Sequence, residues 1–166
     1  AIAVAGLMGA STEDMRRGLS RVRPVAGRLN PMLGRGGVYL IDDSYNANPD
    51  SVSAAIEVLA GCADIATGRR FLVLGELAEL GGGEEQIYRQ LGDLAASSGI
   101  ERLYAVGAAA DAAEAFGTGG RGFRDQEQLV TTLNEELGSG DMVLVKGSRK
   151  AGMEAVIHAF SDGEEG

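Results

Sequence analysis

Short apolar runs alternate with helical patterns from residue 38 onward, and this alternation restricts the fold more than any other feature. The runs at 38–41, 71–74 and 142–145 consist of apolar residues and one tyrosine, as expected for strands, and the run at 71–74 is of the kind buried on both faces. Between them apolar residues recur at helical spacing, for example at i, i+3, i+4, i+7 and i+8 over 52–60. The pattern predicts an α/β fold of the Rossmann-like, doubly wound kind, with a mostly parallel sheet and helices on both faces.

A hairpin is expected at the N-terminal side of this sheet. Apolar segments at 29–33 and 38–41 flank the stretch Gly-Arg-Gly-Gly at 34–37, a pattern typical of two strands joined by a short turn. Further upstream, a Ser-Thr-Glu-Asp cap predicts a short helix that ends near residue 19. A linker over 21–28, interrupted by proline and glycine, separates this helix from the hairpin.

Composition restricts the classes of function. The 166 residues, 45% of them hydrophobic, suffice for one domain with its own core. A net charge of −9 argues against a nucleic-acid partner, because nucleic-acid binders carry basic patches. No apolar run approaches the roughly 18 residues of a membrane span, and no signal peptide is visible, so no membrane partner is expected. The single cysteine, Cys62, cannot form a disulfide within the chain, which is typical of a cytoplasmic protein.

The polar segment at 42–51 reads Asp-Asp-Ser-Tyr-Asn-Ala-Asn-Pro-Asp-Ser and joins a predicted strand to a predicted helix. Asn48 followed by Pro49 is the pattern of an N-cap and a proline in the first turn. A capped helix N-terminus offers free N–H groups and the positive end of the helix dipole, which suit an anion. The same residue types also form ordinary turns, so a purely structural loop is the alternative.

Parallel sheets bind ligands beyond the carboxyl ends of their strands. The polar segment at 42–48 and the loop at 146–149, with its two cations and one serine, both follow predicted strands. We therefore expect them at the same edge of the sheet.

Four segments, in order along the chain, resemble the C-terminal domain of the Mur ligases. They are 22–29 (Val-Arg-Pro-Val-Ala-Gly-Arg-Leu), 42–51, 71–81 (Phe-Leu-Val-Leu-Gly-Glu-Leu-Ala-Glu-Leu-Gly) and 143–149 (Val-Leu-Val-Lys-Gly-Ser-Arg). Within the family they are most similar to the members that add D-alanyl-D-alanine to UDP-N-acetylmuramoyl-tripeptide in peptidoglycan precursor synthesis. The resemblance implies an ATP-dependent ligase in which the tripeptide carboxylate becomes an acyl phosphate that the dipeptide amine attacks.

The family's enzymes also have N-terminal and central domains. The Gly-x-x-x-x-Gly-Lys-Ser/Thr pattern of the central ATPase domain does not occur in this chain. The resemblance therefore implies that the ATP phosphates, Mg²⁺ and the UDP-sugar are held mainly by other domains of a longer enzyme, and that the chain alone is inactive. We expect residues 1–20 to be the tail of the central domain, 21–162 the C-terminal domain and 163–166 a disordered tail.

The resemblance also implies roles for individual residues. Arg28 matches an arginine that approaches the terminal phosphate, and is the candidate catalytic residue; a guanidinium fork suits phosphate oxygens. Asp43 matches an aspartate that accepts hydrogen bonds from the ATP ribose. The residues expected around the nucleotide are Asp43, Tyr45, Asn46 and Asn48. The alternatives are a solvated linker arginine at 28, a turn aspartate at 43, for which Asp42 competes, and an N-cap at 48.

The loop after the last predicted strand is expected to bind the dipeptide. Lys146, Ser148 and Arg149 offer cations and a hydroxyl that suit its carboxylate; the alternative is an ordinary helix start capped by Ser148. With His158 as the only histidine, no zinc site or Ser-His-Asp triad can be assembled, and no metal site is predicted in this chain. Two other functions stay open: a related ligase of the folylpolyglutamate synthase type, and a free-standing nucleotide- or ligand-binding module without catalysis.

Overall fold

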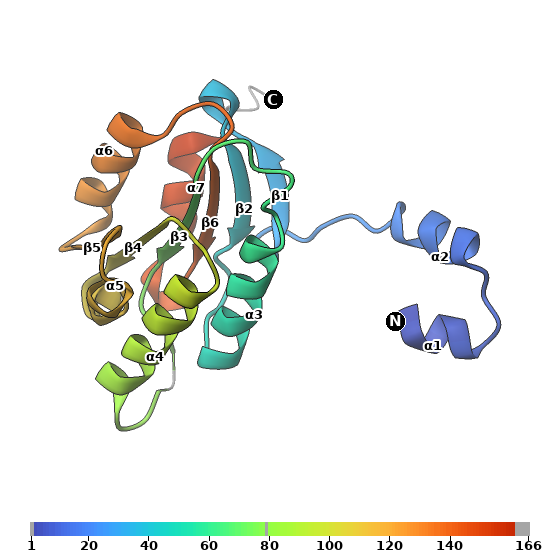
Figure 1. The fold of residues 1–166 in the computed structure, drawn as a ribbon, viewed down its shortest axis with the longest axis horizontal. Helices are drawn as coiled ribbons and strands as arrows, with labels where there is room; N and C mark the ends of the chain where they lie inside the picture. The colour runs from blue at the N-terminus through green and yellow to red at the C-terminus, as the bar shows by residue number, and fades with distance from the viewer. Residues whose placement is uncertain (1, 79, 162–166) are drawn as a thin grey trace.

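A six-stranded sheet forms the centre of the computed structural model, which describes residues 2–78 and 80–161 (Figure 1). The strands are β1 (Asn30–Leu33), β2 (Tyr39–Asp43), β3 (Arg70–Leu74), β4 (Arg102–Val106), β5 (Gly120–Phe123) and β6 (Met142–Lys146). Their spatial order is β1-β2-β6-β3-β4-β5. Only the β1–β2 hairpin is antiparallel among these pairs, so the predicted mostly parallel sheet with an N-terminal hairpin is confirmed.

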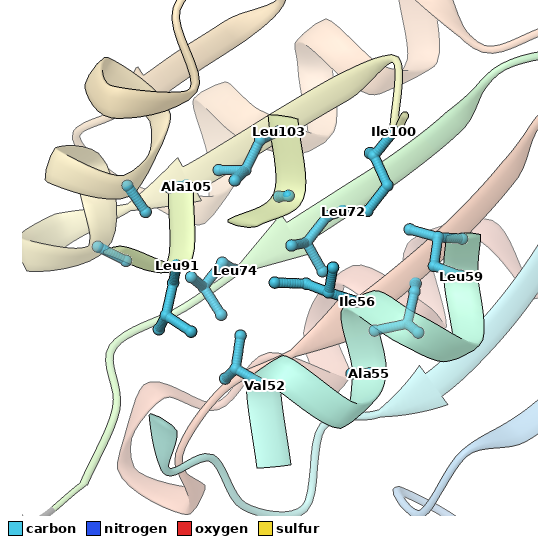
Figure 2. Close-up of a cluster of buried hydrophobic side chains, with 14 of the residues drawn as sticks. Val52, Ala55, Ile56, Leu59, Leu72, Leu74, Leu91, Ile100, Leu103 and Ala105 are labelled. Atoms are coloured by element: carbon cyan, nitrogen blue, oxygen red, sulfur yellow. The ribbon is translucent and has the colours of Figure 1, made fainter. Parts of the chain in front are cut away.

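Helices cover both faces of the sheet. The α-helices are α1 (Ile2–Leu7), α2 (Thr12–Leu19), α3 (Pro49–Ala60), α4 (Glu84–Ser97), α5 (Ala110–Phe116), α6 (Gln126–Glu136) and α7 (Glu154–Phe160). Because side chains alternate along a strand, β3 contributes Leu72 and Leu74 to the layer of α3, α4 and α5 (Figure 2), and Phe71 and Val73 to the layer of α6 and α7. The doubly wound architecture is therefore confirmed.

The structure departs from the periodic pattern in two helices. The spacing over α4 predicts Leu94 on the buried face, but Leu94 is exposed and Tyr88 is buried instead. Tyr88 can be buried because its hydroxyl accepts the Leu77 N–H at 2.9 Å. A final helix is expected over 150–160, but a 3-10 turn, Arg149–Ala151, and Gly152 at φ +62° precede α7.

The first two helices form an arm that lies apart from the sheet (Figure 1). As predicted, Ser11 caps α2 by accepting the Asp14 N–H, and no residue of α2 is buried. The tail predicted at 163–166 lies outside the described residues. Within residues 2–78 and 80–161, no helix is both long enough and apolar enough to cross a membrane.

Candidate functional site

A buried ion pair lies at the carboxyl-end edge of the sheet. The parallel register places Asp43, the last residue of β2, beside Lys146, the last residue of β6. The Lys146 Nζ donates to Asp43 Oδ2 at 2.5 Å and to the carbonyl oxygen of Asn46 at 3.0 Å. The side chains of Lys146 and Asp43 are only 3% and 13% exposed. The pair therefore fixes the start of the loop after β2 to the end of β6.

The two aspartates at 42 and 43 attach the preceding linker to this loop. Asp42 Oδ2 accepts the Gly27 N–H at 2.8 Å, and its Oδ1 accepts the N–H and the hydroxyl of Ser44. Asp43 Oδ1 accepts the Leu29 N–H at 3.1 Å. Asp42 thus forms the turn, whereas Asp43 also lines the cavity described below. Asp42 borders the second cavity described below instead.

Gly27 brings the linker against Tyr45. The Tyr45 N–H donates to the Gly27 carbonyl at 3.0 Å. Gly27 has φ +75°, and a Cβ atom there would lie 2.9 Å from the Tyr45 Cβ, so the approach requires glycine. As a result the Arg28 guanidinium lies over the Tyr45 ring, 4.5 Å from its centre, in a cation–π contact.

Asn48 begins α3. Its side-chain oxygen accepts the Ser51 N–H at 2.8 Å, while the Ser51 hydroxyl accepts the Asn48 N–H at 3.0 Å. With Pro49 at the first helical position, this is the capping box that the sequence predicts. The side chain of Asn48 is therefore an N-cap, and its remaining surface borders the same cavity as Asp43.

A first cavity of about 370 Å³ lies between the linker, the loop after β2 and the start of α3. Its polar lining includes Arg28, Asp43, Tyr45, Asn46, Asn48 and Lys146. All residues predicted to contact the nucleotide, and the candidate catalytic arginine, are thus brought together. Two cations, Arg28 and Lys146, and one anion, Asp43, line the cavity. Its net charge is therefore positive and favours an anionic ligand.

A second cavity of about 340 Å³ borders the same loop and is lined by Ala26, Gly27, Asp42, Ser44, Tyr45, Arg149, Glu154 and His158. Tyr45 lines both cavities, and the Arg149 guanidinium lies 5.6 Å from the centre of its ring. Glu154 and His158 were not predicted as site residues. Their spacing of one helical turn on α7 was the available signal, because such residues share a helix face.

The three residues predicted to bind the dipeptide do not form one cluster. Lys146 lines the first cavity, whereas Arg149 lines the second. Ser148 is buried, and its hydroxyl caps the 3-10 turn by accepting the Ala151 N–H at 3.3 Å. The alternative cap role of Ser148 is therefore observed, and Arg149 is an exposed cation of this loop. Within the described part of the chain, no group of three or more His, Cys, Asp or Glu residues could hold a metal ion.

Comparison with known proteins identifies the class to which this fold and site belong. Residues 27–149 match the family model of the Mur ligase, glutamate ligase domain, and the chain belongs to this family. The match leaves the arm of α1 and α2 outside it.

Among individual proteins, the UDP-N-acetylmuramoyl-tripeptide–D-alanyl-D-alanine ligase of Escherichia coli (strain K12) is 38% identical over 98% of this chain and 36% of its own length. The MurF ligase of Thermotoga maritima, solved in complex with ADP, has a TM-score of 0.73 and 26% identity, covering 95% of this chain and 35% of that one. A bifunctional folylpolyglutamate synthase/dihydrofolate synthase of Yersinia pestis shares the fold, with a TM-score of 0.59 and 22% identity over 89% of this chain and 34% of that one. The chain spans about a third of the length of the curated relatives it matches.

Proposed function

We propose that this chain is the C-terminal domain of a cytoplasmic, ATP-dependent ligase that joins D-alanyl-D-alanine to UDP-N-acetylmuramoyl-tripeptide during peptidoglycan precursor synthesis. The observation that carries the proposal is the first cavity, where residues from the linker and from the loop after β2 converge. The E. coli relative, which carries this activity in its name, supports the choice of substrates. A ligase of the folylpolyglutamate synthase type is the weaker candidate, because the Yersinia protein supports only the fold.

The first cavity would receive the nucleotide. The Arg28 guanidinium is exposed and would offset negative charge on the phosphoryl group that is transferred. Asp43 would accept hydrogen bonds from the ribose hydroxyls, since each carboxylate oxygen can accept more than one donor. The Tyr45 ring holds the Arg28 guanidinium in its cation–π contact, and Asn46 and Asn48 would border the nucleoside.

The second cavity would receive the dipeptide. Arg149 is its exposed cation and would form a charge-assisted pair with the dipeptide carboxylate. Ser148 would contribute by fixing the turn from which Arg149 projects. Because Tyr45 borders both cavities, the bound dipeptide and the bound nucleotide would both lie beside this residue.

The remaining parts of the site belong to the preceding domains in this proposal, with residues 1–20 as the tail of the central one. When bound, Mg²⁺ would supply positive charge to the phosphates, and the proposal places its ligands mainly in those domains. The domain described here would close over the acyl phosphate and exclude water, which would otherwise hydrolyse it.

The test is an assay of phosphate release by the longer protein that contains this chain. We expect release to require ATP, UDP-N-acetylmuramoyl-tripeptide and D-alanyl-D-alanine together. Release that instead required a folate and glutamate would favour the second candidate, and no ATP-dependent ligation with either set would indicate a binding module.

Two variants test the division between the cavities. Arg149→Ala should raise the KM for D-alanyl-D-alanine about ten- to a hundredfold, because a charge-assisted hydrogen bond contributes roughly 1.5–3 kcal/mol. Asp43→Ala should raise the KM for ATP more than that for the dipeptide. Arg35→Ala is the control, since Arg35 lies in the hairpin turn away from both cavities. Equal effects of all three variants would contradict the assignment.

A further inference from the structure

We propose that Lys146 is a positioning residue of the first cavity: it holds Asp43 and the main chain at Asn46 in place for the nucleotide, and does not bind the dipeptide. This inference rests on the proposed function, because it assigns Lys146 to one of the two substrates of the same reaction. It also differs from the expectation that Lys146 acts together with Arg149.

The sheet itself determines which group Lys146 can reach. Asp43 and Lys146 are register partners at the carboxyl ends of adjacent parallel strands, although they are 103 residues apart in the chain. On its other side β6 pairs with β3, where Leu74 is opposite Lys146. Lys146 therefore has a charged neighbour on one side only, and its ammonium turns toward β2 and the loop that follows.

The Lys146 ammonium donates its hydrogen bonds to groups of the protein itself. Lys146 is 2% exposed, and two of its three donors serve the Asp43 carboxylate and the Asn46 carbonyl. A buried ammonium requires such partners, because an unpaired charge is strongly disfavoured in the interior. A dipeptide carboxylate in the second cavity would meet Arg149 instead, since Lys146 does not line that cavity.

The pair also connects the loop to the linker. One oxygen of Asp43 accepts from Lys146, and the other accepts the Leu29 N–H, next to Arg28. The ammonium thus orients the carboxylate directly, and through it fixes the main chain from which Arg28 projects. Loss of this cation should loosen two groups of the nucleotide cavity at once.

The test is a double-mutant cycle in the full-length enzyme with Lys146→Met, Asp43→Asn and the double variant. We expect Lys146→Met to raise the KM for ATP by about tenfold, the loss typical of one charge-assisted hydrogen bond, and to change the KM for D-alanyl-D-alanine by less than about twofold. In the Asp43→Asn background, the same substitution should add less than about twofold, because Lys146 acts through Asp43. Lys150→Met is the matched control, since Lys150 is an exposed lysine of the same loop.

Each outcome bears on one of the two proposals. A larger rise in the dipeptide KM for Lys146→Met, independent of Asp43, would overturn the positioning role. If Asp43→Asn raises the ATP KM while both Lys146→Met and Lys146→Arg leave it unchanged, this inference fails and the proposed function stands. If no variant of the first cavity alters the ATP KM, the nucleotide assignment itself fails. Should Lys146→Met not fold, Lys146→Arg retains the charge with another donor geometry, and we expect it to raise the ATP KM as well.

Discussion

At the scale of single residues, removing one partner of the Lys146–Asp43 pair should cost more stability than replacing both partners. Asp43→Asn leaves the ammonium of Lys146 buried without its counter-charge, so we expect a loss of about 3 kcal/mol in the free energy of unfolding. In Asp43→Asn/Lys146→Met no buried charge is left unpaired, and part of this loss should be recovered. Urea unfolding of the chain, followed by circular dichroism, measures both values. Strictly additive losses would contradict a direct interaction between the two side chains.

Tyr104 should make stability depend on alkaline pH. Burial of its hydroxyl, together with the hydrogen bond to Glu136, raises the pKa of Tyr104 to about 12. Between pH 10 and 12 the tyrosine of the unfolded chain loses its proton first, so the stabilisation is complete below pH 10 and is lost as the pH rises. The loss should be on the order of 2 kcal/mol, because one pKa unit corresponds to about 1.4 kcal/mol. Urea unfolding midpoints at about pH 8 and about pH 11.5 measure this loss of stability.

Tyr104→Phe is the control for this pH effect. The ring still packs between Phe71 and Phe123, whose centres lie 5.6 and 5.3 Å away, so the core is retained. A smaller pH dependence in the variant is the expected result. The same dependence in both proteins would assign the effect to other groups, such as Tyr88, whose pKa burial also raises.

Individual site residues differ in how far their positions follow from sequence. Arg28, Tyr45 and Asn48, which the resemblance places around the nucleotide, line one cavity, because each lies on the short linker or loop next to β2. The partner of Lys146 was not predictable in this way. It depends on β6 lying beside β2, and that strand order is a property of the whole sheet rather than of any local pattern.

At the scale of elements, Gly27 should control how the linker meets the loop after β2. Gly27→Ala adds a Cβ atom 2.9 Å from the Tyr45 Cβ and forces a side chain into positive φ, where strain is typically about 1–2 kcal/mol. We expect the variant to lose more than this strain in stability and to raise the KM for both ATP and the dipeptide, because Tyr45 borders both cavities.

Gly36→Ala separates the effect of backbone strain from the effect of the close contact with Tyr45. Gly36 has a similar φ of +70°, but no atom lies within 4 Å of a Cβ placed there. This control should therefore show the strain alone and normal KM values in the full-length enzyme. Equal stability losses in the two variants would mean that Tyr45 yields to the new methyl group and that the linker contact does not depend on glycine.

Helices and strands could be predicted from the sequence where one local signal was decisive. The capping box at Asn48 marks the start of α3, and the glycine-rich turn marks the β1–β2 hairpin. The start of α7 could not be predicted from the sequence. The apolar spacing continues through Gly152, whereas the positive φ of this residue interrupts the helix. Periodicity reports which face of a segment is buried and carries little information about a single residue in a left-handed conformation.

At the scale of the whole molecule, both cavities border the loop that follows β2, and Tyr45 lines each of them. The chain matches about a third of the length of its curated relatives, and the proposed function assigns the groups that hold the triphosphate and Mg²⁺ to the rest of a longer protein. This division leads to a prediction about the chain alone.

The isolated 166-residue chain should fold but neither ligate nor hydrolyse ATP, and should bind ATP more weakly than the full-length enzyme does. The first cavity offers Arg28 and Asp43 to a nucleotide, but phosphoryl transfer also needs a phosphate cradle and bound Mg²⁺. Titration calorimetry with ATP compares the two affinities, a phosphate-release assay measures turnover, and circular dichroism verifies that the chain is folded. Arg28→Ala of the isolated chain is the control for contaminating ATPases, because a contaminant is insensitive to it. Turnover by the isolated chain that Arg28→Ala abolished would show that the chain holds a complete active site, and the division of the site between domains would then be wrong.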